Sequence, residues 1–182
     1  MRIVAGEWRG RALTAPAGHD TRPTADRVRQ ALFDMLLHAP WGGRDAVKGV
    51  RVLDAFAGTG ALGLEALSRG AAHTTFVEQD RAALTALRGN IARCRAEARS
   101  TVLAADILAL AADQSCDLIF LDPPYRQELI PRALARLRAS GWIAAGALIV
   151  AETARDEPLP LAAEPLAERA HGTARLTIWR EP

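Results

Sequence analysis

The sequence predicts a doubly wound α/β fold. We expect a mostly parallel sheet with helices on both faces, a C-terminal antiparallel β-hairpin and a small N-terminal hairpin–helix extension. Two observations predict the parallel sheet. Short apolar segments recur between residues 51 and 151 with helix-like segments between them, and a glycine-rich turn follows the first apolar segment. Short apolar strands that alternate with helices are typical of a parallel sheet covered on both faces.

Length and composition restrict the class of protein. The chain has 182 residues, 49% of them hydrophobic and 24% charged, which suits one globular domain. No apolar run approaches the roughly 18 residues that cross a bilayer, and the first residues lack a signal peptide, so we expect a cytoplasmic protein without membrane contact. Two cysteines and four scattered histidines support neither a disulfide framework nor a metal site.

The N-terminal elements come first in the chain. The sequence predicts a short hairpin over residues 2–14, with Gly6 and Gly10 as turn or bulge positions. Thr24 stands where it can cap the helix that follows. The apolar face of that helix recurs every four residues, at Val28, Leu32 and Leu36.

A Pro-Trp-Gly-Gly sequence then breaks this helix and marks a boundary. We therefore divide the chain into an N-terminal extension, residues 1–45, and a main domain, residues 46–182. Residues 1–30 contain six arginines and three acidic residues, a net charge of +3, whereas the remaining 17 basic and 18 acidic residues give −1. An arginine-rich segment of this kind either contacts phosphate groups or forms an ordinary solvated surface.

The main domain alternates strands and helices. Expected strands are residues 51–54, 74–77, 101–103, 118–121 and 147–151. Helices are expected at residues 61–69, after Asp80, after Asp106, and up to Arg138. Residues 166–170 and 175–179 predict the terminal hairpin, with its turn at His171-Gly172.

The glycine-rich turn predicts a cofactor site. Residues 58–63 fit the pattern G-x-G-x-x-G, and Glu78 follows Gly58 by 20 residues at the tip of the second strand. Asp54 indicates which cofactor binds there. A carboxylate repels the pyrophosphate of a dinucleotide but attracts the ammonium and sulfonium groups of S-adenosyl-L-methionine. We therefore predict S-adenosyl-L-methionine, and Glu78 would accept hydrogen bonds from its ribose.

A third acidic residue follows the third strand. Asp106 can accept a hydrogen bond from an adenine amino group, or it can cap the next helix, and one residue can do both. The candidate cofactor-binding residues are Asp54, Phe56, Gly58, Gly60, Glu78, Gln79, Asp106, Ile107 and Asp122.

The sequence Asp122-Pro123-Pro124-Tyr125 follows the fourth strand, near the point where α/β sheets bind ligands. Prolines lack an N–H group, so this stiff loop presents mainly acceptors, which suits a substrate with an exocyclic amine. The Asp122 carboxylate and the Pro123 carbonyl would bind both protons of that amine, and Tyr125 would stack on the base. Asp122, Pro123 and Tyr125 are therefore the candidate catalytic residues of a methyl transfer that depends on orientation.

Together the glycine loop and the Asp-Pro-Pro-Tyr loop resemble class I, Rossmann-like methyltransferases that act on exocyclic amines. The segments 2–11, 22–24 and 26–29 and the terminal Trp-Arg-Glu resemble the RsmD family of bacterial 16S ribosomal RNA guanine-N2 methyltransferases. This resemblance covers nearly the whole chain. It implies that Asp122 and Tyr125 hold a guanine, and that the partner is 16S rRNA within the small ribosomal subunit or its assembly intermediate. It also implies an RNA-binding N-terminal hairpin, for which the candidate residues are Arg2, Arg9, Arg11, Arg22, Thr24 and Arg27.

We expect the rRNA methyltransferase that this resemblance implies to be a monomer. Three other functions stay open. An adenine-N6 DNA methyltransferase uses the same four-residue loop, but only about 45 residues remain outside the α/β core for reading DNA. A non-enzymatic RNA-binding module would keep the fold and bind no cofactor. An NAD-dependent oxidoreductase is disfavoured by Asp54 and by the lack of an obvious acid for hydride transfer.

Overall fold

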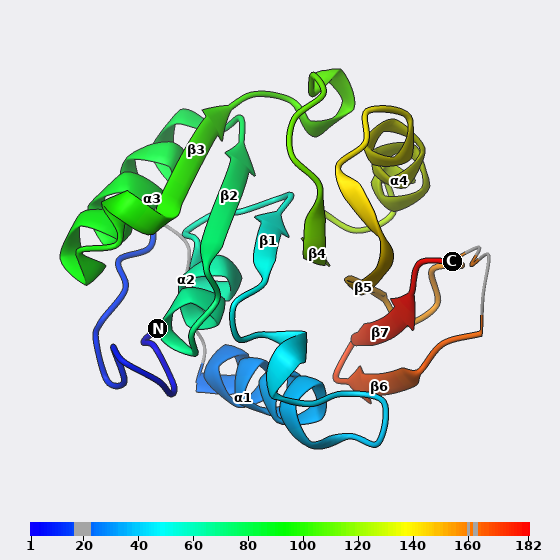
Figure 1. Ribbon diagram of the computed structural model, residues 1–182, viewed down its shortest axis with the longest axis horizontal. Coiled ribbons are helices and arrows are strands. Elements are labelled where there is room, and N and C mark those ends of the chain that lie inside the picture. The colour runs from blue at the N-terminus through cyan, green and yellow to red at the C-terminus, as the bar shows by residue number, and fades with distance from the viewer. Residues whose placement is uncertain (17–22, 160, 162–163) are drawn as a thin grey trace.

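The computed structural model describes residues 1–16, 23–159, 161 and 164–182, without the side chains of residues 23–25. A seven-stranded sheet forms its centre, in the order β3-β2-β1-β4-β5-β7-β6 (Figure 1). The first five strands are parallel, and the last two add an antiparallel hairpin. Their bounds are β1 Arg51–Asp54, β2 His73–Glu78, β3 Ser100–Ala104, β4 Cys116–Leu121, β5 Ile143–Ala154, β6 Ala167–His171 and β7 Ala174–Arg180.

Helices cover both faces of the sheet, which confirms the predicted doubly wound class. They are α1 Pro23–His38, α2 Ala61–Ser68, α3 Arg81–Cys94 and α4 Leu129–Ala139, with 3-10 helices at Arg44–Ala46, Glu97–Arg99 and Ile107–Ala109. One buried cluster, around Phe33, Leu64 and Phe120, joins α1, α2 and α3 to one face of the sheet, which we call the first face. A second cluster joins α4 to the opposite face, around Leu134 and Trp142. No helix among the described residues is long and apolar enough to span a membrane.

The strand order places a ligand site between β1 and β4. From β1 the chain continues to β2 and β3 on one side, and β4 then pairs with the other edge of β1. At such a reversal the loops that leave the two strands diverge and open a crevice at their carboxyl ends. The two loops here are the glycine-rich turn after β1 and the Asp-Pro-Pro-Tyr loop after β4.

Some element boundaries differ from the expected ones. The helix of the N-terminal extension begins at Pro23, so Thr24 lies inside its first turn rather than before it. Residues 2–14 turn at Gly6 and Gly10, both with φ of 83°, but only Arg2 and Ala12 form a β-bridge. The fifth strand spans twelve residues, Ile143–Ala154, because it pairs with β4 on one edge and with β7 on the other.

The N-terminal segment shares the core of the main domain. Ile3, Trp8 and Leu13 are buried in the same cluster as the sheet residues of the first face. Trp8 therefore has a packing role, and the Arg99 guanidinium lies over its ring, 4.9 Å from the centroid. The backbone of residues 1–16 also hydrogen-bonds to α2, through Glu7 N and Ser68 O at 2.7 Å.

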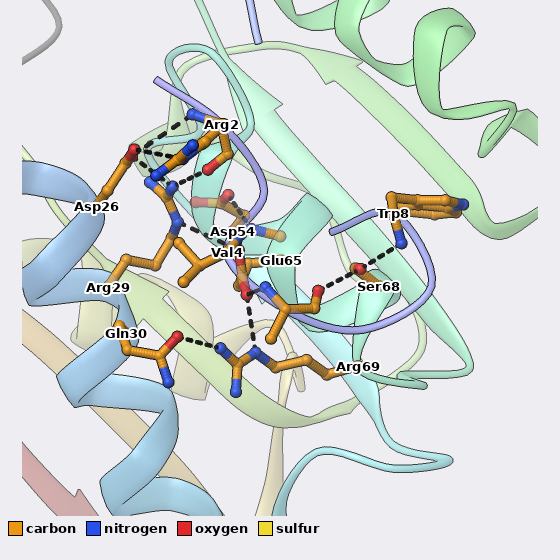
Figure 2. Close-up of polar contacts among 12 residues, drawn as sticks. Arg2, Val4, Trp8, Asp26, Arg29, Gln30, Asp54, Glu65, Ser68 and Arg69 are labelled. Atoms are coloured by element: carbon orange, nitrogen blue, oxygen red, sulfur yellow. Dashed lines mark hydrogen bonds and ion pairs between the residues drawn. The ribbon is translucent and has the colours of Figure 1, made fainter. Parts of the chain in front are cut away.

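A buried carboxylate in α2 holds this segment in place (Figure 2). Glu65 has no exposed surface, and its oxygens accept hydrogen bonds from Val4 N at 2.8 Å and Ala5 N at 3.0 Å. The Nε atoms of Arg69 and Arg29 approach the same carboxylate at 2.8 and 3.4 Å. Two backbone amides and two guanidinium groups thus compensate a charge that would otherwise be costly to bury.

Candidate active site

A cavity of about 640 Å³ opens at the carboxyl ends of the parallel strands. Both predicted loops contribute to its wall, as the strand order requires. The predicted site residues in its wall are Phe56, Gly58, Glu78, Gln79, Asp106, Ile107, Asp122, Pro123 and Tyr125. Pro16, near the end of the N-terminal segment, also lies in this wall.

The glycine-rich turn brings the backbone close to the cavity. Gly58 and Gly60 have φ of 52° and 79°, in the left-handed region that favours glycine. At Gly63 a Cβ atom would lie 2.3 Å from Cε1 of Phe76, so α2 packs against β2 more closely than a side chain allows. Gly58 and Gly60 therefore allow the turn, and Gly63 allows the close packing of α2. Of the three, only Gly58 lines the cavity.

Glu78 connects the second strand to the glycine-rich turn. Its Oε2 accepts a hydrogen bond from Gly58 N at 2.8 Å, and its Oε1 accepts from Gln79 N and Asp80 N, also at 2.8 Å. A carboxylate has about four lone-pair positions, so acceptor capacity remains for a ligand hydroxyl. Nearby, Asp106 caps the 3-10 helix after β3 through Leu108 N at 2.9 Å, and its side chain is exposed to the cavity.

Asp54 at the end of β1 is a buried carboxyl group. Its Oδ2 accepts a hydrogen bond from Gly63 N at 2.9 Å, and no ion pair to it is found among the described residues. Burial, and after it the charge of Glu78, raises the pKa of Asp54 to about 7, although the Gly63 hydrogen bond opposes this shift. A cationic ligand beside Asp54 would favour its ionised form, which is the condition expected at a site for a sulfonium or ammonium group.

The Asp-Pro-Pro-Tyr loop presents acceptors, as its composition predicts. Asp122 is exposed toward the cavity, but protein atoms surround its carboxyl group. This desolvation, and then the charges of Glu152 and Asp54, raise the pKa of Asp122 above its usual range. The hydroxyl group of Tyr125 donates a hydrogen bond to Oε1 of Glu152 at 2.5 Å. Burial and this bond raise the pKa of Tyr125 above its usual range, so its hydroxyl group keeps its proton.

A second cavity, of about 450 Å³, adjoins the first. The two share the residues Phe56, Gly58, Thr59 and Asp122 in their walls. Asp54 lines only the second cavity, and Gly60 lines neither. The second cavity is bounded by Met1 of the N-terminal segment, by Val28 and Leu32 of α1, and by Glu152 and His171 near the last three strands. Asp122 thus stands where the two cavities meet.

None of the predicted RNA-binding residues that the structure describes lines either cavity. Arg2, Arg9 and Arg27 are exposed, and the side chain of Arg2 approaches Asp26 at 3.9 Å. Arg11 is half-buried and donates a hydrogen bond to the carbonyl oxygen of Arg93 at 2.9 Å. The other two predicted residues, Arg22 and the side chain of Thr24, lie outside the described residues.

Sequence reasoning missed one residue that supports the site and one that lines the second cavity. Asn90 of α3 is fully buried, and its Nδ2 donates to the carbonyl oxygens of Thr14 and Thr59 at 2.9 Å each. It therefore ties the N-terminal segment to the glycine-rich turn. Glu152 follows the apolar residues 147–151 of β5, and a charged residue at the end of a buried strand is a signal that could have marked it as a site residue. Among the ranges that the structure describes, no group of three or more acidic, histidine or cysteine residues could hold a metal ion.

Comparisons with known proteins agree with this geometry. The family described as "Conserved hypothetical protein 95" matches residues 1–180. "Ribosomal RNA small subunit methyltransferase D" of Escherichia coli K12 is 40% identical over 162 residues, which cover 88% of this chain and 78% of that protein. "Putative rRNA methyltransferase YlbH" of Bacillus subtilis is 36% identical over 165 residues, covering 88% and 86%. The solved structure of "Putative methyltransferase yhhF" from Escherichia coli has a TM-score of 0.84 at 35% identity, covering 100% and 97%.

Proposed function

Since the chain belongs to the RsmD family of ribosomal RNA methyltransferases, we propose that it methylates the exocyclic N2 amine of a guanine in 16S rRNA. The methyl donor in this proposal is S-adenosyl-L-methionine. The observation that carries the proposal is the position of Asp122 at the junction of two cavities. Donor and acceptor can then enter from opposite sides and meet at one carboxyl group.

The first cavity fits the nucleoside part of the donor. Glu78 retains acceptor capacity for ribose hydroxyls, and the exposed carboxylate of Asp106 suits an exocyclic amine of adenine. Asp54 is buried, has no ion pair in the part of the chain that the structure describes, and lines only the second cavity, so it suits the positive charge of a donor whose methionine part reaches past the junction at Asp122. When bound, S-adenosyl-L-methionine supplies a methyl group activated by its sulfonium.

The Asp-Pro-Pro-Tyr loop then orients the acceptor. Asp122 accepts a hydrogen bond from the guanine N2 amine and fixes its direction, which reduces the entropy that the transfer must overcome. As the new N–CH₃ bond forms and the S–CH₃ bond breaks, the nitrogen becomes acidic and loses one proton. The raised pKa of Asp122 makes its carboxylate a better acceptor for that proton than an ordinary aspartate. Tyr125 lines the first cavity only, so its ring would stack on a base that reaches from the second cavity past the junction at Asp122.

For the RNA, we propose that residues 1–45 form the contacting extension. Met1 lies in the wall of the second cavity and Pro16 in the wall of the first, so the N-terminal segment passes beside both. The exposed Arg2, Arg9 and Arg27 on this extension suit contacts with phosphate groups. The substrate in this proposal is the small ribosomal subunit or an assembly intermediate in the cytoplasm, and the enzyme acts as a monomer.

A methyl-transfer assay tests the proposal. Tritium-labelled S-adenosyl-L-methionine is supplied with 30S subunits, with naked 16S rRNA and with duplex DNA. We expect label in ribosomal RNA, recovered as N2-methylguanosine after digestion, and primer extension then maps the modified nucleotide. Asp122→Ala should abolish transfer, whereas its affinity for S-adenosyl-L-methionine in calorimetry changes little. Label in DNA alone, or in RNA as a methylated adenosine, would overturn the proposal.

A further inference from the structure

The loop residues described so far do not distinguish guanine from other bases. Guanine, adenine and cytosine each carry an exocyclic amine that Asp122 can accept. They differ at the ring nitrogen beside this amine, because N1 of guanine carries a proton, whereas N1 of adenine and N3 of cytosine are acceptors. A residue that selects guanine must therefore offer a second acceptor next to Asp122.

Strand register places Glu152 in that position. Leu121 of β4 pairs with Ala151 of β5, so the next residues along the two parallel strands are Asp122 and Glu152. Phe120 and Val150, two residues earlier on each strand, belong to the same buried cluster, and side chains two apart on a strand share a face. Both carboxyl groups accordingly line the second cavity, and the charge of Glu152 contributes to the raised pKa of Asp122.

The Glu152 carboxyl group is held with one oxygen free to accept. Its Oε1 receives the hydrogen bond from the Tyr125 hydroxyl group at 2.5 Å. Its Oε2 lies 3.6 Å from Nε2 of His171, which is too long for a good hydrogen bond. Tyr125 thus fixes the direction of the carboxyl group, while Oε2 keeps its acceptor capacity.

The rest of the second cavity suits a flat, partly apolar ligand. Its volume of about 450 Å³ lies within the usual range of small-ligand pockets. Apolar side chains from the N-terminal segment, α1, α2 and β7 also line it. They are Met1, Val28, Leu32, Leu62 and Leu176.

We propose that Glu152 selects guanine by accepting the hydrogen bond of its N1–H, while Asp122 accepts that of the N2 amine. This inference rests on the methyl transfer proposed above and names the residue that determines its base specificity. With adenine or cytosine, the ring-nitrogen lone pair would face the carboxylate instead, and an acceptor facing an acceptor is repulsive. A well-placed pair of hydrogen bonds to one base typically discriminates by about 10- to 100-fold.

Replacing the target guanine by 2-aminopurine tests this directly. The analogue keeps the 2-amino group and lacks the N1 proton, and it can be placed at the mapped nucleotide of reconstituted 30S subunits. The wild-type enzyme should methylate guanine with a kcat/KM about 10- to 100-fold above that for 2-aminopurine. Equal rates on the two bases would refute the role of Glu152 without any variant. No transfer to guanine would instead refute the proposed function.

The variant Glu152→Gln tests whether Glu152 recognises the base or only positions Tyr125. The Tyr125 hydroxyl group would hold the amide oxygen, which leaves the amide NH₂ facing the base. Transfer to guanine should fall about 10- to 100-fold, and the preference over 2-aminopurine should shrink or reverse. Glu97→Gln is the matched control, because Glu97 is exposed in a 3-10 helix before β3, and it should behave as wild type. If Glu152→Gln slows both bases equally, Glu152 only positions Tyr125 and the proposal is wrong.

Discussion

Removal of the Glu65 carboxylate should destabilise the fold more than any surface change. Glu65→Ala deletes a fully buried acceptor that four donor groups share. The donors are Val4 N at 2.8 Å, Ala5 N at 3.0 Å, Arg69 Nε at 2.8 Å and Arg29 Nε at 3.4 Å. After the change, Arg69, whose side chain is 7% exposed, loses its ion pair with Glu65, and Arg29, which is 4% exposed, keeps only the ion pair with Asp26 at 2.8 Å.

The magnitude follows from these losses. Removing one partner of a buried ion pair costs about 3–5 kcal/mol, because the other charge stays buried without compensation. The N-terminal segment could detach to solvate the freed amides, but it would then expose Ile3, Trp8 and Leu13. Exposing each of these side chains costs about 1.5–3 kcal/mol, so detachment does not avoid the loss. We therefore expect the free energy of unfolding to fall by about 3–5 kcal/mol.

Urea denaturation followed by circular dichroism measures this change. With a slope of about 2 kcal/mol per molar urea, the midpoint should decrease by about 1.5–2.5 M. Glu65→Gln keeps one acceptor oxygen and should lose less. The control Glu97→Ala changes an exposed glutamate and should stay within about 0.5 kcal/mol of wild type. A loss below about 1 kcal/mol in Glu65→Ala would show that the carboxylate does not hold the N-terminal segment.

Three further predictions concern charge, packing and RNA. The folded protein keeps the Asp54 proton up to about pH 7, whereas the unfolded chain releases it near pH 4. The free energy of unfolding should therefore fall as the pH rises between these values, by up to about 4 kcal/mol. Asp54→Asn should remove the Asp54 contribution to this pH dependence in urea titrations, whereas the contribution of Asp122, whose pKa is also raised, should remain. Gly63→Ala should cost about 1–3 kcal/mol, because the added methyl group would lie 2.3 Å from the Phe76 ring. Arg9→Ala should weaken RNA binding and reduce its logarithmic salt slope by about 1.

Each of these predictions has a matched check. Gly89→Ala, in α3 with no atom near the added methyl group, should stabilise the protein by about 0.5–1 kcal/mol, and an equal effect at both glycines would contradict the packing argument. Arg132→Ala changes an exposed arginine on α4, across the sheet from the N-terminal segment, and should leave RNA binding unchanged. If the free energy of unfolding of Asp54→Asn depends on pH as that of the wild type does, a group other than Asp54 causes this dependence.

Local patterns in the sequence predicted the main elements and both functional loops. The apolar segments around Val52, Phe76 and Phe120 became strands because each is buried on both faces, and this shows directly in composition. The glycine-rich turn and the Asp-Pro-Pro-Tyr loop were recognisable because backbone restrictions act between neighbouring residues. Their meeting at one crevice depends on the strand order, in which β1 and β4 are neighbours.

Only the tertiary structure decided which distant residues meet. Glu65 contacts the backbone of Val4, 61 positions away, and Asn90 contacts Thr14, 76 positions away. The adjacency of Asp122 and Glu152 depends on the register between β4 and β5. Sequence periodicity shows which side chains are buried, but hydrogen-bond partners and cavity walls depend on the packing of whole elements. That packing is the combined result of many weak contacts, which no local pattern contains.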